Sequence, residues 1–276
     1  MTEPTGPTVW TILELDVVAD TVEIVSDGLW CLGVSAVEEI VSDTDTVTLR
    51  ANVSVESAAA VADLAHLHGA AFRWVSVPVS VTETWREHAQ ATHVVDDVWL
   101  VPAWVAPPAG RPVMVEPFDV FGLGNHPTTT LALAGALAVA KSGDLVLDMG
   151  CGSGVLAVAL SALVGCRCEC HDIAPQSRHA VRHNSRLNSV ENLVSWTSGP
   201  AGGEPARYDL VLANILAPVL CELAGELQTA VRPNGSMVLS GVRDDQTDRV
   251  LSAYDRCEVV SRSSLEGWTA LTLRGR

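Results

Sequence analysis

Apolar and polar positions follow two different periods along the first eighty residues. Strands show apolar side chains at alternate positions, whereas helices repeat them every three to four residues. The pattern predicts strands at residues 10–18, 34–43, 46–53 and 71–81, helical spacing over residues 21–40 interrupted at Gly33, and a helix at residues 57–68. The order β-α-β-β-α-β is that of an α+β ferredoxin-like domain, which we expect over residues 1–80.

The pattern changes after this domain. Residues 81–111 carry separated tryptophans and the pair Pro107-Pro108, which indicates an interdomain linker. From residue 112 on, strand and helix patterns alternate. Strands are predicted at residues 145–148, 166–172, 210–214 and 237–241, and helices near residues 154–164, 175–188 and 217–231. Such alternation predicts a parallel sheet covered on both faces, a Rossmann-like doubly wound α/β domain over residues 112–276.

Charge is divided unevenly along the chain. Of 33 acidic residues, sixteen lie in residues 1–105 beside only three basic ones, a net charge of −13. This acidity favours a basic protein partner and argues against direct nucleic-acid binding through this part, although it is also typical of a domain that is simply well solvated. Seven cysteines without paired CxxC spacing, no apolar run of about 20 residues and no secretory signal pattern predict a cytoplasmic protein away from membranes.

A glycine-rich turn gives the strongest chemical signal. In LVLDMGCGSG, residues 145–154, a strand ends at Asp148 and the glycines Gly150, Gly152 and Gly154 follow at alternate positions before an apolar helix. Glycines let a backbone turn sharply beside a ligand. The spacing differs from the dinucleotide fingerprint and suits a ligand that ends in an amino acid, whose ammonium Asp148 can meet directly or through water. The alternative is a purely structural tight turn.

Asp172 ends the next predicted strand, about twenty residues after the glycines. In this architecture a carboxylate at that place accepts hydrogen bonds from ribose hydroxyls, so Asp172 is our predicted ribose ligand. Three cysteines precede it at alternate positions, Cys166, Cys168 and Cys170, and share one strand face. We interpret them as buried thiols rather than a zinc site, and no metal is expected.

Two further segments supply polar groups. YDLVLANILAP, residues 208–218, delivers Asn214 at a strand end, where its carboxamide can orient an amine. No aromatic residue follows to stack on a flipped base, which argues against enzymes that methylate DNA adenine or glutamine. FGLGNHPTTTLAL, residues 121–133, places Thr129 in the first turn of a helix, from which we expect it to reach a ligand bound at the glycine turn. His126 in this segment is interpreted as structural, with action as a general base as the alternative.

These motifs together resemble the ribosomal protein L11 methyltransferase family (PrmA). FGLGNHPTT, DMGCGSG, HDIAPQ, LANILAP and LSGV occur in the family's order across residues 115–242. The first eighty residues are similar to its substrate-recognition module, and residues 82–104 to its linker. The resemblance implies transfer of methyl groups from S-adenosyl-L-methionine to lysine side chains and the terminal amine of a ribosomal protein. The implied cofactor contacts are Thr129, Gly150, Asp172 and Asn214.

The chain departs from the family pattern in ways that concern the substrate. Leu123 and Asn125 replace threonines, Ala174 replaces an acid, and EPFDVF stands for the usual D-P-G-L-A-F. The nearest alternative is a methyltransferase for another protein lysine or a small-molecule amine. A noncatalytic cofactor-sensing protein and an RNA methyltransferase fit these residues less well.

Overall fold

The computed structural model describes residues 9–276 except residues 33, 35–36, 42–44, 52, 54–56, 79–85, 87–88, 119 and 198–204. The chain divides into two compact units, Met1–Ala89 and Gln90–Arg276. Each unit has its own hydrophobic core. No helix among the described residues is long and apolar enough to cross a membrane.

The first unit is a four-stranded antiparallel sheet with two helices. Its elements are β1 (Val9–Val18), the short 3-10 helix η1 (Ala19–Thr21), α1 (Val22–Cys31), β2 (Val37–Val41), β3 (Thr46–Ala51), α2 (Ala58–Leu67) and β4 (Ala71–Pro78). The strands lie in the order β2-β3-β1-β4. Helical spacing continues in the sequence to Ile40, but α1 ends at Cys31, because the β-branched residues of β2 pair in register with β3.

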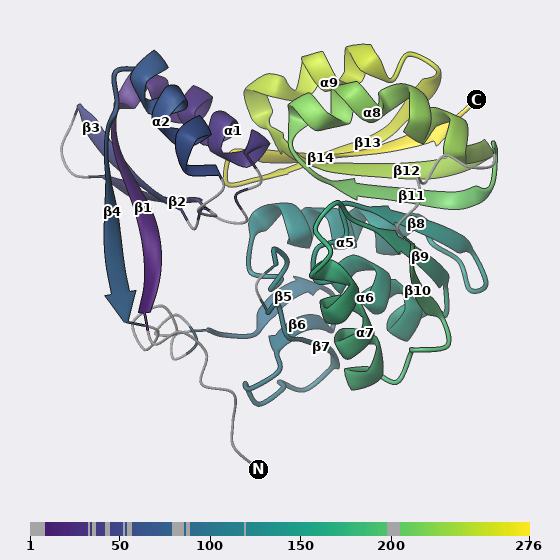
Figure 1. Cartoon of the computed structure of the whole chain (residues 1–276). Coiled ribbons are helices and arrows are strands. Elements are labelled where there is room, and N and C mark those ends of the chain that lie inside the picture. Colours follow the sequence, from purple (N-terminus) through teal and green to yellow (C-terminus); the bar gives the residue numbers. More distant parts are fainter. Residues whose placement is uncertain are drawn as a thin grey trace. The chain divides into compact units, whose positions relative to one another are not determined.

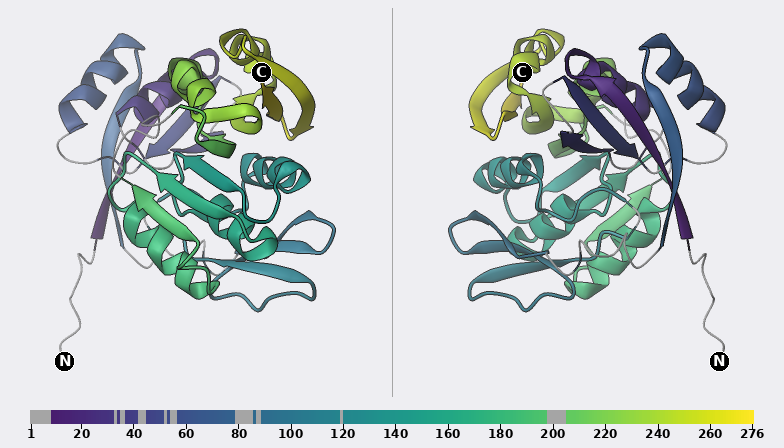
Figure 2. Two further views of the ribbon diagram at one scale, coloured as in Figure 1. Left: turned by 90° about the vertical axis from the view of Figure 1, so that its right-hand side faces the viewer. Right: turned by 90° about the vertical axis from the view of Figure 1, so that its left-hand side faces the viewer.

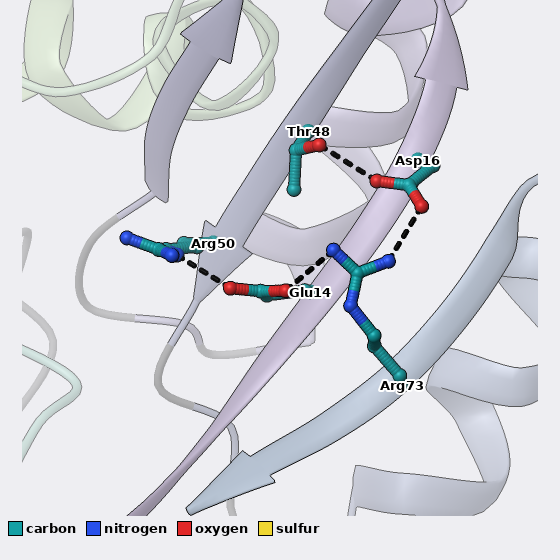
Figure 3. Close-up of polar contacts among 5 residues, drawn as sticks. All are labelled: Glu14, Asp16, Thr48, Arg50 and Arg73. Carbon is teal, nitrogen blue, oxygen red and sulfur yellow. Dashed lines mark hydrogen bonds and ion pairs between the residues drawn. The ribbon is translucent and has the colours of Figure 1, made fainter. Parts of the chain in front are cut away.

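The alternation along β1 separates two faces of this sheet. Leu13, Leu15 and Val17 are buried in a core with residues of α1 and α2. Glu14 and Asp16 therefore lie on the opposite face. Figure 3 shows a polar cluster there: Arg73 bridges both carboxylates at 2.6 Å, Arg50 bonds Glu14 at 2.7 Å, and Thr48 donates to Asp16 at 2.6 Å. The bond with Arg50 is the main cause that lowers the pKa of Glu14.

The second unit is built on a mixed seven-stranded sheet (Figure 1). Its strands are β8 (Leu145–Met149), β9 (Arg167–His171), β10 (Val194–Thr197), β11 (Tyr208–Asn214), β12 (Val231–Arg243), β13 (Cys257–Leu265) and β14 (Trp268–Gly275). They lie in the order β10-β9-β8-β11-β12-β14-β13. The first five are parallel, and β14 runs antiparallel to both of its neighbours. The central strands agree with the alternation in the sequence.

Helices cover both faces of this sheet, as Figure 2 also shows. The helices are α5 (Pro127–Val139), α6 (Val155–Val164), α7 (Ser177–Leu187), α8 (Ala217–Ala230), the short η3 (Asp244–Gln246) and α9 (Thr247–Ala253). Along β11, Leu210 and Leu212 pack in one core with α5 and α6, whereas Val211 and Ala213 pack in a second core with α8. Alternate residues of a strand that is buried on both sides thus pack in two different cores.

Much of the segment expected as a linker is folded. Residues 92–115 form the three-stranded sheet β5 (Thr92–Val95), β6 (Val98–Pro102) and β7 (Arg111–Val115). Val98, Leu100, Val113 and Val115 are buried in the same core as α6. The expected boundary at residue 112 therefore differs from the observed division at residue 90. The Pro107-Pro108 pair lies in the loop between β6 and β7. Because two adjacent prolines are typical of loops, the sequence pattern indicated a linker for the whole segment.

Candidate cofactor and acceptor site

Three neighbouring parallel strands carry the polar residues predicted from sequence. The order β9-β8-β11 places the carboxyl ends of these strands side by side. Asp148 lies in β8, Asp172 directly follows β9, and Asn214 ends β11. The strand order reverses between β8 and β11, and the edge beside such a reversal is where open α/β sheets bind ligands.

The glycine turn is shaped by contacts within the protein. Gly150, Gly152 and Gly154 have φ angles of +70°, +51° and +76°. A Cβ at Gly150 would lie 2.3 Å from Cγ2 of Ile215, and one at Gly152 would lie 2.3 Å from the carbonyl oxygen of Phe121. A Cβ at Gly154 would meet Val181 of α7 at 2.8 Å. Positive φ and lack of space both require glycine at these positions.

Asp148 lies beneath the turn with 1% of its surface exposed. Its Oδ2 accepts a 3.2 Å hydrogen bond from the backbone N–H of Ala157 in α6. Burial raises the pKa of Asp148 to about 7, an effect that the bond from Ala157 partly offsets and the charge of Asp172 reinforces. The carboxyl is thus buried at the end of β8 and is joined to the first turn of α6.

Asp172 holds the turn from the side. Its Oδ2 accepts a 2.7 Å bond from the N–H of Gly152, and its Oδ1 accepts a 2.8 Å bond from the N–H of Ala174. Each carboxylate oxygen has two lone pairs, so one on each oxygen is left for a further donor. The side chain is partly exposed, so a pair of hydroxyl groups can reach it.

An open hollow of about 500 Å³ begins at this carboxylate. It is lined by His171, Asp172, Ile173, Pro175 and Trp196. Ile173 is 93% exposed, and the indole N–H of Trp196 is buried without a partner among the described residues. An apolar rim, one carboxylate and a donor without an acceptor together fit a nucleoside rather than a metal ion.

Asn214 meets Thr129 from a distant part of the chain. The Nδ2 of Asn214 lies 3.5 Å from Oγ1 of Thr129, which is fully buried in the first turn of α5. Ser240 of β12 donates a 2.9 Å bond to the carbonyl of Thr128 and fixes this turn to the sheet. The amide nitrogen is therefore held at one side. The residue is partly exposed, so its carbonyl oxygen can accept a hydrogen bond from an N–H group of a bound molecule.

Residues that the sequence analysis did not single out hold the loop above the turn. The Oγ of Ser153 donates to the carbonyl of Gly122 at 2.6 Å, and its N–H donates to the carbonyl of Phe121 at 2.9 Å. Asn184 of α7, fully buried, bonds the N–H and C=O of Glu116 and also the carbonyl of Ser153. A serine in a glycine-rich turn and an asparagine in a polar helix give no distinctive signal in a sequence.

His126 caps α5. Its Nδ1 accepts from the backbone N–H of Thr128 at 3.3 Å and lies 2.8 Å from the hydroxyl of the same residue. Its ring makes edge contacts with Phe121 and Trp268, at centroid distances of 5.8 and 5.1 Å. Burial lowers the pKa of His126, and Glu266 partly offsets this effect. The geometry agrees with the structural interpretation of this histidine.

The cysteines at alternate positions of β9 are buried beneath α6, together with Cys151 of the turn. Burial raises the pKa of Cys166 to about 11, and Ser161 donates to Cys168 at 3.4 Å. Among the described residues we find no group of three or more potential metal ligands. These cysteines act as small apolar residues of the core.

The four predicted motifs thus converge on one edge of the sheet. Gly152 bonds Asp172, Ile215 lies over Gly150, Asn214 meets Thr129, and Phe121 contacts the turn. The arrangement can hold a nucleoside beside Asp172 and a polar group such as an amine beside Asn214.

Known proteins share this arrangement of sequence and fold. A family model described as ribosomal protein L11 methyltransferase (PrmA) matches residues 79–276. A ribosomal protein L11 methyltransferase of Thiobacillus denitrificans is 40% identical over 177 residues, covering 63% of this chain and 59% of that protein. One of Alkalilimnicola ehrlichii is 38% identical over 197 residues, covering 69% of this chain and 67% of that protein.

A solved structure, the ribosomal protein L11 methylase of Lactobacillus delbrueckii subsp. bulgaricus, is 25% identical with a TM-score of 0.62, covering 68% of this chain and 100% of that chain. The chain spans about three fifths to two thirds of the length of the curated relatives it matches. The family model covers more than half of the chain, including every motif at the sheet edge. The chain belongs to the ribosomal protein L11 methyltransferase (PrmA) family, with an α/β methyltransferase fold in its second unit.

Proposed function

We propose that this chain transfers methyl groups from S-adenosyl-L-methionine to lysine side chains and the N-terminal amine of ribosomal protein L11. Membership of the family supports this activity. The observation that carries it is the convergence at the carboxyl ends of β9, β8 and β11, where Gly152 bonds Asp172 and Asn214 meets Thr129. Because the proposed substrate is a ribosomal protein, the enzyme would act in the cytoplasm.

The residues present fit the cofactor. The remaining lone pairs of Asp172 accept hydrogen bonds from the two ribose hydroxyls. The hollow lined by Ile173 and Trp196 receives the adenine. The turn formed by Gly150, Gly152 and Gly154 faces the amino-acid end, with the carboxyl of Asp148 below it. When bound, S-adenosyl-L-methionine supplies an electrophilic methyl group on a sulfonium.

The acceptor must present an amine with a free lone pair. Lysine has an ordinary pKa of about 10.4, so its amine is mostly protonated near neutrality. Desolvation at the site favours the neutral form, and Asn214, fixed by Thr129, orients that amine through its carbonyl. Positioning, rather than a strong base, provides the acceleration.

The first unit serves as the substrate-recognition domain in this proposal. Its strand order, β2-β3-β1-β4, and its β-α-β-β-α-β element order support the assignment as ferredoxin-like. Arg50 and Arg73 pair with Glu14 and Asp16 on the sheet face opposite the core. The excess of negative charge suits a basic protein substrate.

Methyl transfer to purified L11 tests the proposal. The full chain is incubated with labelled S-adenosyl-L-methionine and recombinant L11, and the methylated positions are identified by mass spectrometry. We expect label on lysines and on the terminal amine. A cell extract is offered in parallel, because label on another protein or on a small amine, with L11 unlabelled, would contradict L11 as the substrate.

A further inference from the structure

The outer face of α7 carries a stripe of positive charge. Arg178, Arg182 and Arg186 recur at every fourth residue and are all exposed. His179 and His183 lie between them and are exposed as well. The helix contains no acidic residue. Residues four apart lie on one side of a helix, so the three arginines form a single row.

The opposite face of α7 is firmly held. Ala180, Val181 and Ser185 are buried, and Asn184 bonds both backbone groups of Glu116. Asn188 bonds Met114 of β7 in the same way, at 2.9 and 2.8 Å. Because these bonds fix the rotation of α7 about its axis, the arginine row has one orientation on the second unit.

The arginines of this row are not neutralised by carboxylates of the described residues. Among the described residues, no carboxylate lies within ion-pair distance of Arg178, Arg182 or Arg186. Five other described arginines pair with carboxylates, namely Arg50, Arg73, Arg111, Arg207 and Arg232. Arg249 and Arg262 also have no such partner within the described part of the chain, but they lie on different elements, α9 and β13, and do not form a row. In a chain with a net charge of −16, a row of unneutralised cations is a distinct electrostatic feature.

Aromatic rings accompany the row. The guanidinium of Arg178 lies over the ring of Trp196, 5.9 Å from its centroid. Phe118, 38% exposed and with φ of +52°, makes edge contacts with His179 and His183 at 4.8 and 5.0 Å. Surfaces that bind single-stranded nucleic acid combine cations for the backbone with rings on which bases stack.

We propose that the outer face of α7 binds the sugar-phosphate backbone of a single-stranded RNA segment. The arginines lie about 6 Å apart along the helix axis, a spacing on the scale of successive phosphates in an extended strand. Each guanidinium presents a fork of donors that matches a phosphate. The exposed ring of Phe118 favours RNA over an acidic peptide, because a base can stack on it. The site lies outside the methyl-transfer chemistry and goes beyond the proposed function.

The acidity of residues 1–105 does not exclude this site. At physiological ionic strength, exposed charges more than about 8 Å apart are largely screened from each other. The net charge of a long stretch of chain therefore does not fix the potential at one helix face. The sequence-based expectation of no direct nucleic-acid binding rested on the net charge of long stretches of the chain. Such a sum conceals a row of arginines confined to about three helical turns.

Binding of a labelled RNA to the full chain tests the proposal. The probe is a fluorescein-labelled mixed-sequence RNA of about 12 nucleotides, followed by anisotropy from roughly 50 to 200 mM salt. The variant is Arg182→Gln with Arg186→Gln, which keeps Arg178 beside the cofactor hollow. The matched control is Arg249→Gln with Arg262→Gln, two exposed arginines on α9 and β13.

We expect the unmodified chain to bind with a log–log salt slope of about −2, since each neutralised phosphate of a single strand contributes about −0.7. The α7 variant should bind at least about tenfold more weakly, with a slope near −0.7, whereas the control should stay within about twofold. Absence of binding by the unmodified chain, or equal binding by the α7 variant, would overturn the proposal. Displacement of the RNA by poly-L-glutamate at equal charge would assign the face to an acidic protein instead.

The outcome is separable from that of the proposed function. Both double variants should bind S-adenosylhomocysteine as the unmodified chain does, which also shows that they are folded. A chain that binds RNA but not S-adenosylhomocysteine would contradict the proposed function and leave the α7 site standing.

Discussion

The backbone N–H of Gly152 donates a 2.7 Å hydrogen bond to Oδ2 of Asp172, twenty residues further along the chain. This bond joins the glycine turn after β8 to the end of β9. In the proposed function, it sets the distance between the turn that faces the amino-acid group of the cofactor and the carboxylate that faces its ribose. In the same proposal, cofactor binding depends on this connection, and methyl transfer depends on the contact between Asn214 and Thr129.

Asp172→Ala should weaken binding of S-adenosylhomocysteine by on the order of 100-fold. The substitution removes the acceptors for both ribose hydroxyls and for the N–H groups of Gly152 and Ala174, and hydrogen bonds to a charged group contribute about 1.5–3 kcal/mol each. Titration calorimetry measures the change. Asp255→Ala, at an exposed position of the same unit, is the control and should leave the affinity unchanged. Equal affinity of both variants for S-adenosylhomocysteine would contradict the role of Asp172 as a cofactor ligand.

Asn214→Ala should abolish most methyl transfer while largely retaining cofactor affinity. Loss of the oriented carboxamide leaves the amine poorly aligned, and a misplacement of about 1 Å can cost on the order of 100-fold in rate. The turnover number is measured with L11 at saturating S-adenosyl-L-methionine, beside calorimetry with S-adenosylhomocysteine. Asn192→Ala, in an exposed turn, is the matched control. Unchanged turnover in the Asn214 variant would exclude this role.

Gly150→Ala should lower the free energy of unfolding by about 3 kcal/mol, from a positive φ and a contact of Cβ with Ile215. In a double variant with Ile215→Ala, the nearest remaining atom of that side chain is its Cβ, 3.8 Å away. A double-mutant cycle in urea should therefore show a favourable coupling of about 1–3 kcal/mol. Gly152→Ala should show no such coupling to Ile215, because its clash is with the backbone carbonyl of Phe121. Additive effects in the Gly150 cycle would contradict the packing described.

Asp148→Asn should change how stability depends on pH. The folded-state pKa of about 7 lies above the unfolded value of about 3.9, so the folded chain binds more protons between these values. The contribution of Asp148 is fully present below pH 4 and is lost as the pH rises through 7. The difference in free energy of unfolding between the asparagine variant and the unmodified chain should therefore shift in favour of the variant from pH 5 to pH 8, by a few kcal/mol at most. Urea unfolding at these two values checks the sign, and a constant difference would contradict the raised pKa.

His126→Ala should cost about 1 kcal/mol in the free energy of unfolding, because the cap of α5 is lost, and His126→Asn should restore most of it. We expect turnover of the asparagine variant within about threefold of the unmodified chain. Restored stability with turnover still reduced more than tenfold would show that His126 acts on the acceptor amine rather than on the helix.

The central strands and helices of the second unit were predictable because their signals are local. A strand buried on both faces is continuously apolar, and glycines with positive φ between β8 and α6 have few substitutes. The positions of Asp148, Asp172 and Asn214 at neighbouring strand ends follow from the parallel order of β9, β8 and β11.

What the sequence did not show depends on contacts between distant residues. β5, β6 and β7 are short, and their place in the core depends on packing of Leu100 and Val113 against α5 and α6. Asn184 reveals its role only through bonds to Glu116 and Ser153, which lie 68 and 31 residues away. The arginine row of α7 was hidden by the net charge of the chain, although its four-residue period is present in the sequence.

Titration of S-adenosylhomocysteine into the folded chain tests the central claim most directly. The account predicts saturable heat with one site per chain, sharply reduced by Asp172→Ala and retained in Asn214→Ala. A folded chain that gives no heat, or one whose affinity is the same in all three proteins, would contradict the assignment of this sheet edge as the cofactor site.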